Sequence, residues 1–449
     1  MKRILLFTIL LFFTITCSNL DGSEPSPRNT FLKFYQGPYS ITASGMELTP
    51  DGYVVIGNML VEDNIRDTTY ISAVVFKTNT SGNRTLGFKE IQGGTGKAIR
   101  AIYNGNNITG YVMVGDRIIV NPLEPLVANV SISSLRGAVL DPNFEITRTF
   151  TIADETPVPA PPQINETIIL EDFTGESIEV TPEGKYYILG TSKRAITAQQ
   201  LAPAEPFIIA YNADNSESWR KRYDLLGRTS QNSKSLHYTV VDSKPRLTWA
   251  AAIADVAGDF INSWVSIPTI EENSVYPNYS VYGQNSQQYF VPKDICLASS
   301  PAFGFAVVGT YSETQDGSKG NIFFMTVRND GTINASSLRY FDGVNSDLLT
   351  DRNVSITEDR GEAITSTQDG GFVLAGSAES QNNKDLVLIK VDAAGNVVWT
   401  RRFGGAGDEV PTAIRETPEG DLIICGTNTL GNFATVFLLK TNRNGELKD

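Results

Sequence analysis

The residue types that most often carry chemistry are scarce in this sequence. One histidine and three cysteines stand among 449 residues. A metal site with several histidines, a four-cysteine zinc site and a disulfide scaffold are therefore excluded. No Gly-rich phosphate loop, EF-hand spacing or HExxH motif is present. We predict that the protein holds no metal, uses no cofactor and is not an enzyme.

The individual candidates have plain structural interpretations. His237 has no serine or cysteine nucleophile at a recognisable spacing, so we interpret it as a packed or hydrogen-bonded histidine. Cys296 and Cys425 fall in predicted strands, and we expect buried free thiols rather than a disulfide. Carboxylate pairs such as Glu271 and Glu272 are of the type that hydrolyses glycosides, but their spacing does not distinguish them from solvated charges.

The N-terminus has the organisation of a secretory signal. A short basic head precedes an apolar run over 4–15, which is too short to cross a bilayer as a helix. Cys17 follows almost at once. The stretch 14–17 resembles the lipobox of bacterial lipoproteins, in which the cysteine becomes the lipidated first residue of the mature chain. The resemblance implies a signal peptide over 1–16 and a lipid on Cys17.

A polar segment separates this cysteine from the rest of the chain. Residues 18–29 contain two prolines and one glycine and no apolar run. Such a composition is typical of a flexible linker, so we predict that 17–29 tether a lipid to a folded body. Ser18, rather than an aspartate, follows the cysteine, which favours the outer membrane of a Gram-negative cell. We expect a lipid-anchored protein there, on the cell surface or the periplasmic face.

A four-strand pattern recurs along the chain. Its clearest copy has an alternating strand and an Asp-Gly turn over 363–371, then a second strand ending in Gly376. A third strand over 386–392 and a fourth over 397–403 follow. Self-similarity at a fixed period is the signature of repeat folds. We count seven copies, which begin near residues 45, 97, 177, 234, 303, 363 and 413; in the fourth copy we expect the third strand at 260–267.

The seventh copy is incomplete at the C-terminus. It ends just after its third-to-fourth turn, whereas residues 30–37 near the N-terminus match the fourth-strand pattern. Placing this segment on the last sheet completes seven four-stranded sheets without an open edge. The sequence therefore predicts an all-β fold: a seven-bladed β-propeller of four-stranded antiparallel blades over 30–449, with the ring closed by the N-terminal strand.

This repeat resembles a known group of proteins. The stretches TQDGGFVLAG over 367–376 and LIKVDAAGNVVWTRRFGG over 388–405 are similar to propeller repeats of secreted and cell-surface lipoproteins of Bacteroidota. They are similar more loosely to quinoprotein-type propeller repeats. The resemblance implies the propeller fold and a place at the cell envelope. It says little about chemistry, because one propeller scaffold hosts many functions.

The candidate binding residues lie where the repeat is interrupted. Six long loops are expected on one face of the disc, and surplus loop length often carries function. These loops span 58–70, 116–127, 153–174, 191–206, 310–320 and 342–360. From them and from a tyrosine-rich stretch between the fourth and fifth copies we select these candidates for binding a ligand or partner: Asp116, Pro159, Pro161, Tyr276, Tyr279 and Tyr282.

Charge and repeat together lead to a binding role. With 37 Lys and Arg against 50 Asp and Glu, the net charge is −13, so nucleic acid is excluded as a partner. We predict a lipoprotein that acts as a protein–protein interaction scaffold or accessory subunit of an outer-membrane complex. Its expected partners are that complex, or another cell-surface macromolecule, and the membrane through the lipid. The alternative is a surface lipoprotein that binds or degrades polysaccharide.

Overall fold

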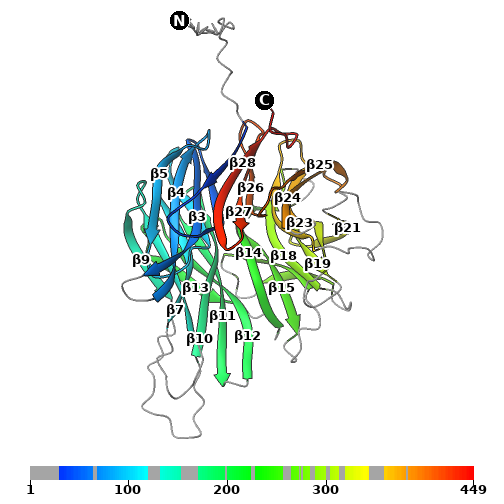
Figure 1. The fold of residues 1–449 in the computed structure, drawn as a ribbon. Coiled ribbons are helices and arrows are strands. Elements are labelled where there is room, and N and C mark those ends of the chain that lie inside the picture. Colours follow the sequence, from blue (N-terminus) through cyan, green and yellow to red (C-terminus); the bar gives the residue numbers. More distant parts are fainter. Residues whose placement is uncertain are drawn as a thin grey trace, which may run out of the picture.

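The computed structural model describes residues 30–63, 68–119, 132–152, 170–197, 200–223, 228–255, 264–272, 274, 277–283, 289–299, 304–312, 319–342, 358–380 and 383–448. Within these ranges the chain forms 28 β-strands in seven antiparallel four-stranded sheets (Figure 1). The same ranges contain no helical segment of the length and apolar character that crossing a bilayer requires.

Six of the sheets are built from four consecutive strands. Blade 1 comprises β2 (Ile41–Thr49), β3 (Gly52–Asp63), β4 (Thr68–Asn79) and β5 (Arg84–Ile91). Blade 2 comprises β6 (Ala98–Asn104), β7 (Asn107–Ile119), β8 (Ile132–Leu140) and β9 (Ile146–Ile152). Blade 3 comprises β10 (Leu170–Val180), β11 (Tyr186–Thr197), β12 (Gln200–Tyr211) and β13 (Glu217–Arg222). Blade 4 comprises β14 (Arg228–Val241), β15 (Lys244–Asp255), β16 (Trp264–Glu271) and β17 (Asn278–Tyr282).

The remaining blades complete the ring. Blade 5 comprises β18 (Tyr289–Leu297), β19 (Phe305–Ser312), β20 (Gly320–Val327) and β21 (Ile333–Phe341). Blade 6 comprises β22 (Arg360–Ser366), β23 (Phe372–Ser380), β24 (Asn383–Val391) and β25 (Val397–Phe403). Blade 7 comprises β26 (Asp408–Glu416), β27 (Leu422–Leu430), β28 (Phe433–Thr441) and β1 (Phe31–Tyr35). The first strands contact one another from blade to blade and β26 contacts β2, which confirms the seven-bladed propeller.

The middle strands explain why the sequence shows apolar runs rather than clean alternation. Each blade packs between two neighbours, so both faces of its central strands are buried. Every residue of β19 and β20 is buried, whereas the outer strand β25 is mostly half-exposed. A strand covered on both faces needs an almost continuous apolar sequence, and an edge strand does not.

The N-terminal strand closes the ring as predicted. β1 pairs antiparallel with β28, from Phe31 opposite Lys440 to Tyr35 opposite Val436. Tyr35 is buried, and its hydroxyl donates to the carbonyl oxygen of Gly82 in blade 1 at 2.6 Å. β1 therefore completes blade 7 and also contacts the next blade.

The first strands carry a repeated irregularity that sets up the centre of the molecule. In five of them one residue is skipped in the pairing with the second strand, which defines a β-bulge. A bulge turns the unpaired side chain out of the regular alternation. The skipped residues are Ser44, Glu176, Lys293, Glu362 and Thr412, and all five line the central channel.

The glycine of the second strand has a role in this bulge. We expected Gly376 at the end of its strand, but it lies inside β23, opposite Gly361 and next to the bulged Glu362. A Cβ there would run into the carbonyl oxygen of Arg360. Four other blades have the same arrangement at the equivalent glycine: Gly57, Gly190, Gly309 and Gly426.

Two of the predicted long loops are in fact extended hairpins. β3 and β4 stay paired out to Asp63 opposite Thr68, and β11 and β12 out to Thr197 opposite Gln200. The segments 58–63 and 191–197 continue strands β3 and β11, and pairing satisfies their backbone groups. In blade 4 the third strand is β16, which starts at Trp264; residues 256–263 lie outside the described part.

Side chains that the sequence marked as structural are buried or, for His237, half-buried. Cys296 and Cys425 are free buried thiols, as predicted. His237 bonds through Nε2 to the carbonyl oxygen of Ile295 at 2.6 Å, which agrees with the interpretation as a hydrogen-bonded histidine. Trp249 is fully buried in the core of blade 4.

One buried acid makes stability depend on pH. Glu409 accepts hydrogen bonds from the Gly405 amide at 3.2 Å and the Asn428 side chain at 3.0 Å, yet it is only 8% exposed. Burial, with a smaller contribution from Asp385 and Asp408, raises its pKa from 4.5 to about 6. A raised carboxyl pKa means that the folded state binds the proton more tightly, so stability falls as pH rises from 4.5 to 6.

We expect Glu409→Gln to stabilise the protein by about 1–2 kcal/mol at pH 7.5, because the charged form loses roughly 1.4 kcal/mol for each unit by which the pKa is raised. The gain should largely vanish at pH 4.5. Urea unfolding at both pH values measures it. The exposed Glu183→Gln is the matched control and should leave the unfolding free energy unchanged at both. A pH-independent effect of Glu409→Gln would contradict the assignment.

Candidate binding site in the central channel

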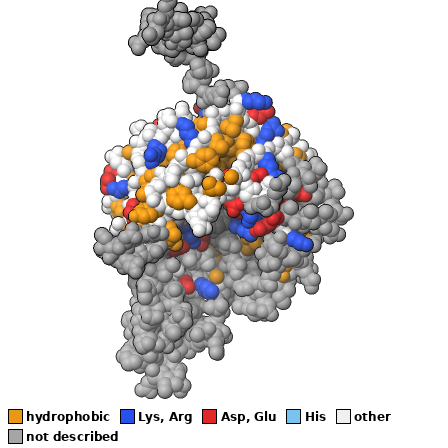
Figure 2. Space-filling view, viewed as in Figure 1, with side chains coloured by type: hydrophobic (Ala, Val, Ile, Leu, Met, Phe, Trp, Pro, Cys, Tyr) orange, Lys and Arg blue, Asp and Glu red, His pale blue; other side chains and the backbone are white. Residues whose placement is uncertain are grey.

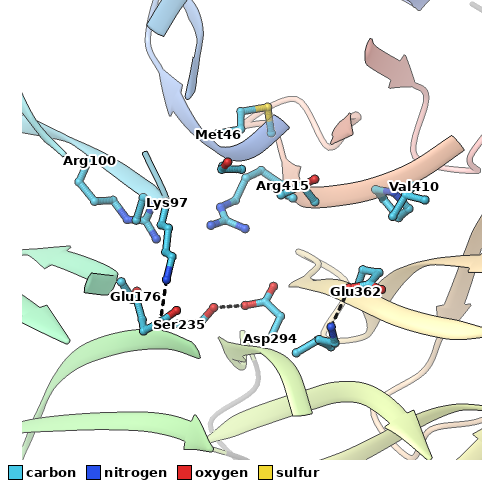
Figure 3. A pocket seen from close by; sticks show the side chains of 17 residues that line it. Met46, Lys97, Arg100, Glu176, Ser235, Asp294, Glu362, Val410 and Arg415 are labelled. Carbon is cyan, nitrogen blue, oxygen red and sulfur yellow. Dashed lines mark hydrogen bonds and ion pairs between the residues drawn. The ribbon is translucent and has the colours of Figure 1, made fainter. Parts of the chain in front are cut away.

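The first strands surround a cavity of about 280 Å³ at the centre of the ring (Figure 3). Each blade contributes one residue at the level of the bulges. In blade order these residues are Ser44, Lys97, Glu176, Ser235, Lys293, Glu362 and Thr412. The site is therefore assembled from all seven repeats, and only ring closure brings its residues together.

Most charges in the channel are paired between neighbouring blades. Lys97 Nζ lies 3.1 Å from Glu176 of blade 3 and 2.7 Å from Asp116 of its own blade. Lys293 pairs in the same way with Glu362 of blade 6 at 3.7 Å. These pairs hold adjacent blades in register and leave little free charge at their positions.

Burial shapes the protonation of this network. It raises the pKa of Asp116, and the favourable charge of Lys97 does not fully offset it. Burial also disfavours the charged form of Lys97. The negative charges and hydrogen bonds of Glu176 and Asp116 outweigh this effect, so the pKa of the Lys97 amine is raised. The network therefore depends on its members being present together, since removing one would leave a half-buried charge without its partner.

A second group of charged side chains lies three residues further along the first strands of two blades, at Arg100 and Arg415. Arg100 approaches Glu47 at 3.7 Å, and Arg415 lies nearby on β26. Burial raises the pKa of Glu47, and the charges of Arg100 and Arg415 only partly offset it.

Arg415 differs from the other channel cations. Its side chain points into the cavity, and its guanidinium donates to the carbonyl oxygen of Ile414 at 2.7 Å (Figure 3). It forms no ion pair with any carboxylate in the described residues. The nearby Asp294 is already satisfied, because it accepts from Ser235 and from the Ile364 amide at 3.0 Å. The guanidinium therefore retains free donors that face the channel.

The lining contains no aromatic side chain among its described residues. The described part of the chain also holds no group of three or more His, Cys, Asp or Glu side chains placed to share a metal ion. The channel therefore offers an arginine and several half-buried ion pairs for binding.

The structure separates the residues selected from the sequence. Asp116 lies in β7 and supports the channel, where its Oδ1 accepts from the Gly175 amide at 2.8 Å in addition to the contact with Lys97. Tyr279 and Tyr282 lie in β17, at the outer edge of blade 4, and an odd spacing in a strand directs them to opposite faces. Cys17, Pro159, Pro161 and Tyr276 lie outside the described residues.

A short sequence motif coincides with channel residues that were not among the candidates selected from the sequence. The second position of a Gly/Pro-x-small/polar-Ile stretch enters the channel in five blades. The stretches are GKAI over 96–99, GESI over 175–178, PKDI over 292–295, GEAI over 361–364 and PTAI over 411–414. In the last of these stretches, Arg415 follows the isoleucine directly.

Comparison with known proteins identifies the fold and no family. No family model matches the chain, and no curated protein matches it in sequence. Among solved structures, an ulvan lyase described as a new family of polysaccharide lyase aligns with a TM-score of 0.50 and 10% identity over 92% of this chain and 98% of its own. The β-propeller domain of the Trilobed protease from Pyrococcus furiosus aligns with a TM-score of 0.42 and 9% identity, over 92% and 97%.

An acylaminoacyl peptidase from Pyrococcus horikoshii also matches, with a TM-score of 0.46 and 11% identity over 91% of this chain. The chain spans about half of that enzyme, 52% of its length. At such identities the likeness concerns the fold alone. It nevertheless corrects the prediction that the protein is not an enzyme: the ulvan lyase is an enzyme that shares the fold over nearly its whole length, so the propeller fold does not exclude catalysis.

Proposed function

We propose that this protein is an outer-membrane lipoprotein of the Bacteroidota propeller type, and that its propeller captures an acidic side chain of a partner protein in the central channel. The observation that carries the proposal is the guanidinium of Arg415, which faces the channel without a carboxylate partner in the described residues. Arginine binds carboxylates through two parallel hydrogen bonds, and partial burial strengthens such a pair.

A protein partner fits this channel better than a sugar. Glycan sites are expected to present aromatic rings for stacking, and the described lining has none. A cavity of about 280 Å³ has room for one side chain reaching in from a partner docked above the ring. The rigid ring of paired charges around it would hold Arg415 in place, which limits the entropy lost on binding.

The anchor is tested by Cys17→Ala. Without the thiol no lipid can be attached, so we expect the variant to leave the membrane fraction and to appear in the soluble fraction after cell fractionation. Mass spectrometry of the wild-type N-terminal peptide should show the added acyl chains. Retention of the variant in membranes would contradict the lipid anchor.

The channel is tested by Arg415→Gln in quantitative pull-downs from solubilised outer membranes. Loss of one member of a desolvated charge pair at an interface typically costs 2 kcal/mol or more, so recovery of a stoichiometric partner should fall about tenfold or further. Arg328→Gln, the same substitution at an exposed turn of blade 5, is the control and should leave recovery unchanged. Equal recovery with both variants, or retention only on an array of acidic glycans, would overturn the proposal.

A further inference from the structure

The rim of blade 7 carries an apolar groove between β1 and blade 6. It has a volume of about 570 Å³, and a patch of hydrophobic side chains covers this part of the surface around β28 (Figure 2). Four of its lining side chains are large, apolar and 43–61% exposed: Leu32, Phe34, Leu430 and Leu447. Its floor is formed by buried core residues such as Phe437 and Leu439. We call these four exposed side chains and their floor the rim groove.

Exposed apolar residues elsewhere in the described chain do not form such a groove. Ile146, Val240, Leu297 and Val398 stand singly on different blades, and Leu60 and Ile71 form one cross-strand pair. Phe433 pairs with Leu430 at the end of blade 7 but does not line the groove. Single exposed apolar side chains are ordinary, but a contiguous concave cluster marks a surface that is covered by something.

The position of the groove in the chain indicates what covers it. Leu32 and Phe34 belong to β1, and Leu32 comes three residues after the end of the predicted tether at Asn29. A tether of 12 residues spans at most about 40 Å when extended, and about 20 Å on average when flexible. A lipid on Cys17 would therefore hold the bilayer surface within this distance of the rim groove, and at a high effective concentration.

The charge of the groove does not oppose this contact. The chain as a whole carries a net charge of −13, which an anionic lipid surface repels. The groove itself is lined by one acid, the buried Glu409, and one base, Arg402, whose Nε lies 2.7 Å from Asp385. Its exposed parts are apolar.

We propose that the rim groove docks on the lipid surface to which the protein is anchored. The proposal rests on the lipid anchor proposed above. Because β1 is the outermost strand of its blade, docking there sets the disc on its edge, and both openings of the channel stay free for a partner. The anchor and the channel would then act together: the first holds the disc upright, and the second meets the partner alongside the membrane.

The test uses the full lipidated protein in vesicles of phosphatidylethanolamine and phosphatidylglycerol at a ratio of about 3:1, chosen to approximate a bacterial membrane. A fluorophore is attached to Leu447→Cys in one sample and to Val240→Cys, on blade 4, in the other. The native thiols Cys296 and Cys425 are buried and should not react. Quenching by nitroxide-labelled lipids should be at least twofold stronger at position 447 than at position 240. Equal quenching while the protein floats with the vesicles would overturn the docking.

Two further variants separate the groove from the anchor and from folding. Leu32→Ser/Phe34→Ser should lower quenching at 447 to the level at 240 while flotation persists, whereas Leu60→Ser/Ile71→Ser, matched in exposure on blade 1, should change neither. Leu430→Ser, outside β1, should lower quenching by itself, so a fold defect in the first variant does not decide the result. A dimer in solution that buries position 447 without lipid would overturn the proposal. Failure of the wild type to float would instead refute the anchor.

Discussion

Deletion of residues 30–37 is expected to unfold most of the protein at physiological temperature. The deletion removes β1 and with it five residue pairs between β1 and β28. It also removes the buried Tyr35, whose ring lies 5.0 Å from that of Phe76 in blade 1. Buried aromatic area and several hydrogen bonds together amount to a loss on the order of 5 kcal/mol. This is comparable to the whole stability of an ordinary domain. The bare edge of β28 would also invite aggregation.

The position of β1, rather than its place in the sequence, should matter. In blade 6, Trp399 pairs with Lys390 after a tight turn, and in blade 7 Phe31 pairs with the equivalent Lys440. Residues 31–37 moved to follow Lys448 would therefore continue as the fourth strand of blade 7 in the same register. We expect this permuted chain to regain the melting temperature of the wild type. An unchanged melting temperature after simple deletion would refute closure by β1.

The second large effect is expected from Gly376→Ala. The new Cβ would run into the carbonyl oxygen of Arg360 and come within 2.8 Å of Ile322. Because β22 and β23 are hydrogen-bonded on both sides of the bulge, we expect that they cannot move apart to make room. Overpacking against fixed backbone typically costs 1–3 kcal/mol and sometimes more, so we expect about 3 kcal/mol. The bulged Glu362 would shift with its strand, and its pairing with Lys293 in the channel would weaken.

Gly87→Ala is the matched control. Gly87 lies in the outer strand β5, and a Cβ there meets nothing within 4 Å. Alanine is also slightly preferred over glycine in a strand, so stability should be unchanged or rise by up to about 0.5 kcal/mol. Thermal and urea unfolding of the two variants side by side would decide the point. Similar losses in both would show that the second-strand glycine serves the strand in general and not the bulge.

The sequence was sufficient for the fold because the relevant interactions are local and repeated. Alternating strands, Asp-Gly turns such as Asp369-Gly370 and the incomplete seventh copy predicted four strands per blade, seven blades and the closing strand. The fourth blade was predicted less well: its third strand was expected at 260–267 and is β16, Trp264–Glu271. Its first strand, β14, departs from the pattern of the others, with two register shifts instead of one simple bulge.

The candidate site was not predictable in the same way. Loop length directed attention to one face of the disc, whereas the channel draws one residue from each blade at separations of tens of residues along the chain. Asp116 was selected for its place after a strand. Its ion pair with Lys97 forms within blade 2, but its hydrogen bond with Gly175 forms only when blades 2 and 3 are packed together. The GEAI-type stretch can be recognised as a channel motif only after the structure has shown where its second residue lies. A four-residue pattern alone does not reveal which way a side chain points.

The sequence by itself determined the number of blades, the closing strand and the scarcity of catalytic residue types, since each depends on residue identity or on a pattern that repeats along the chain. Only the tertiary structure decided that Arg415 lacks a carboxylate partner within the described residues while Lys97 and Lys293 are paired. It also decided that the apolar side chains of β1 line an open groove. Both outcomes depend on distances between blades, and these are set by packing around a closed ring rather than by any local stretch of sequence.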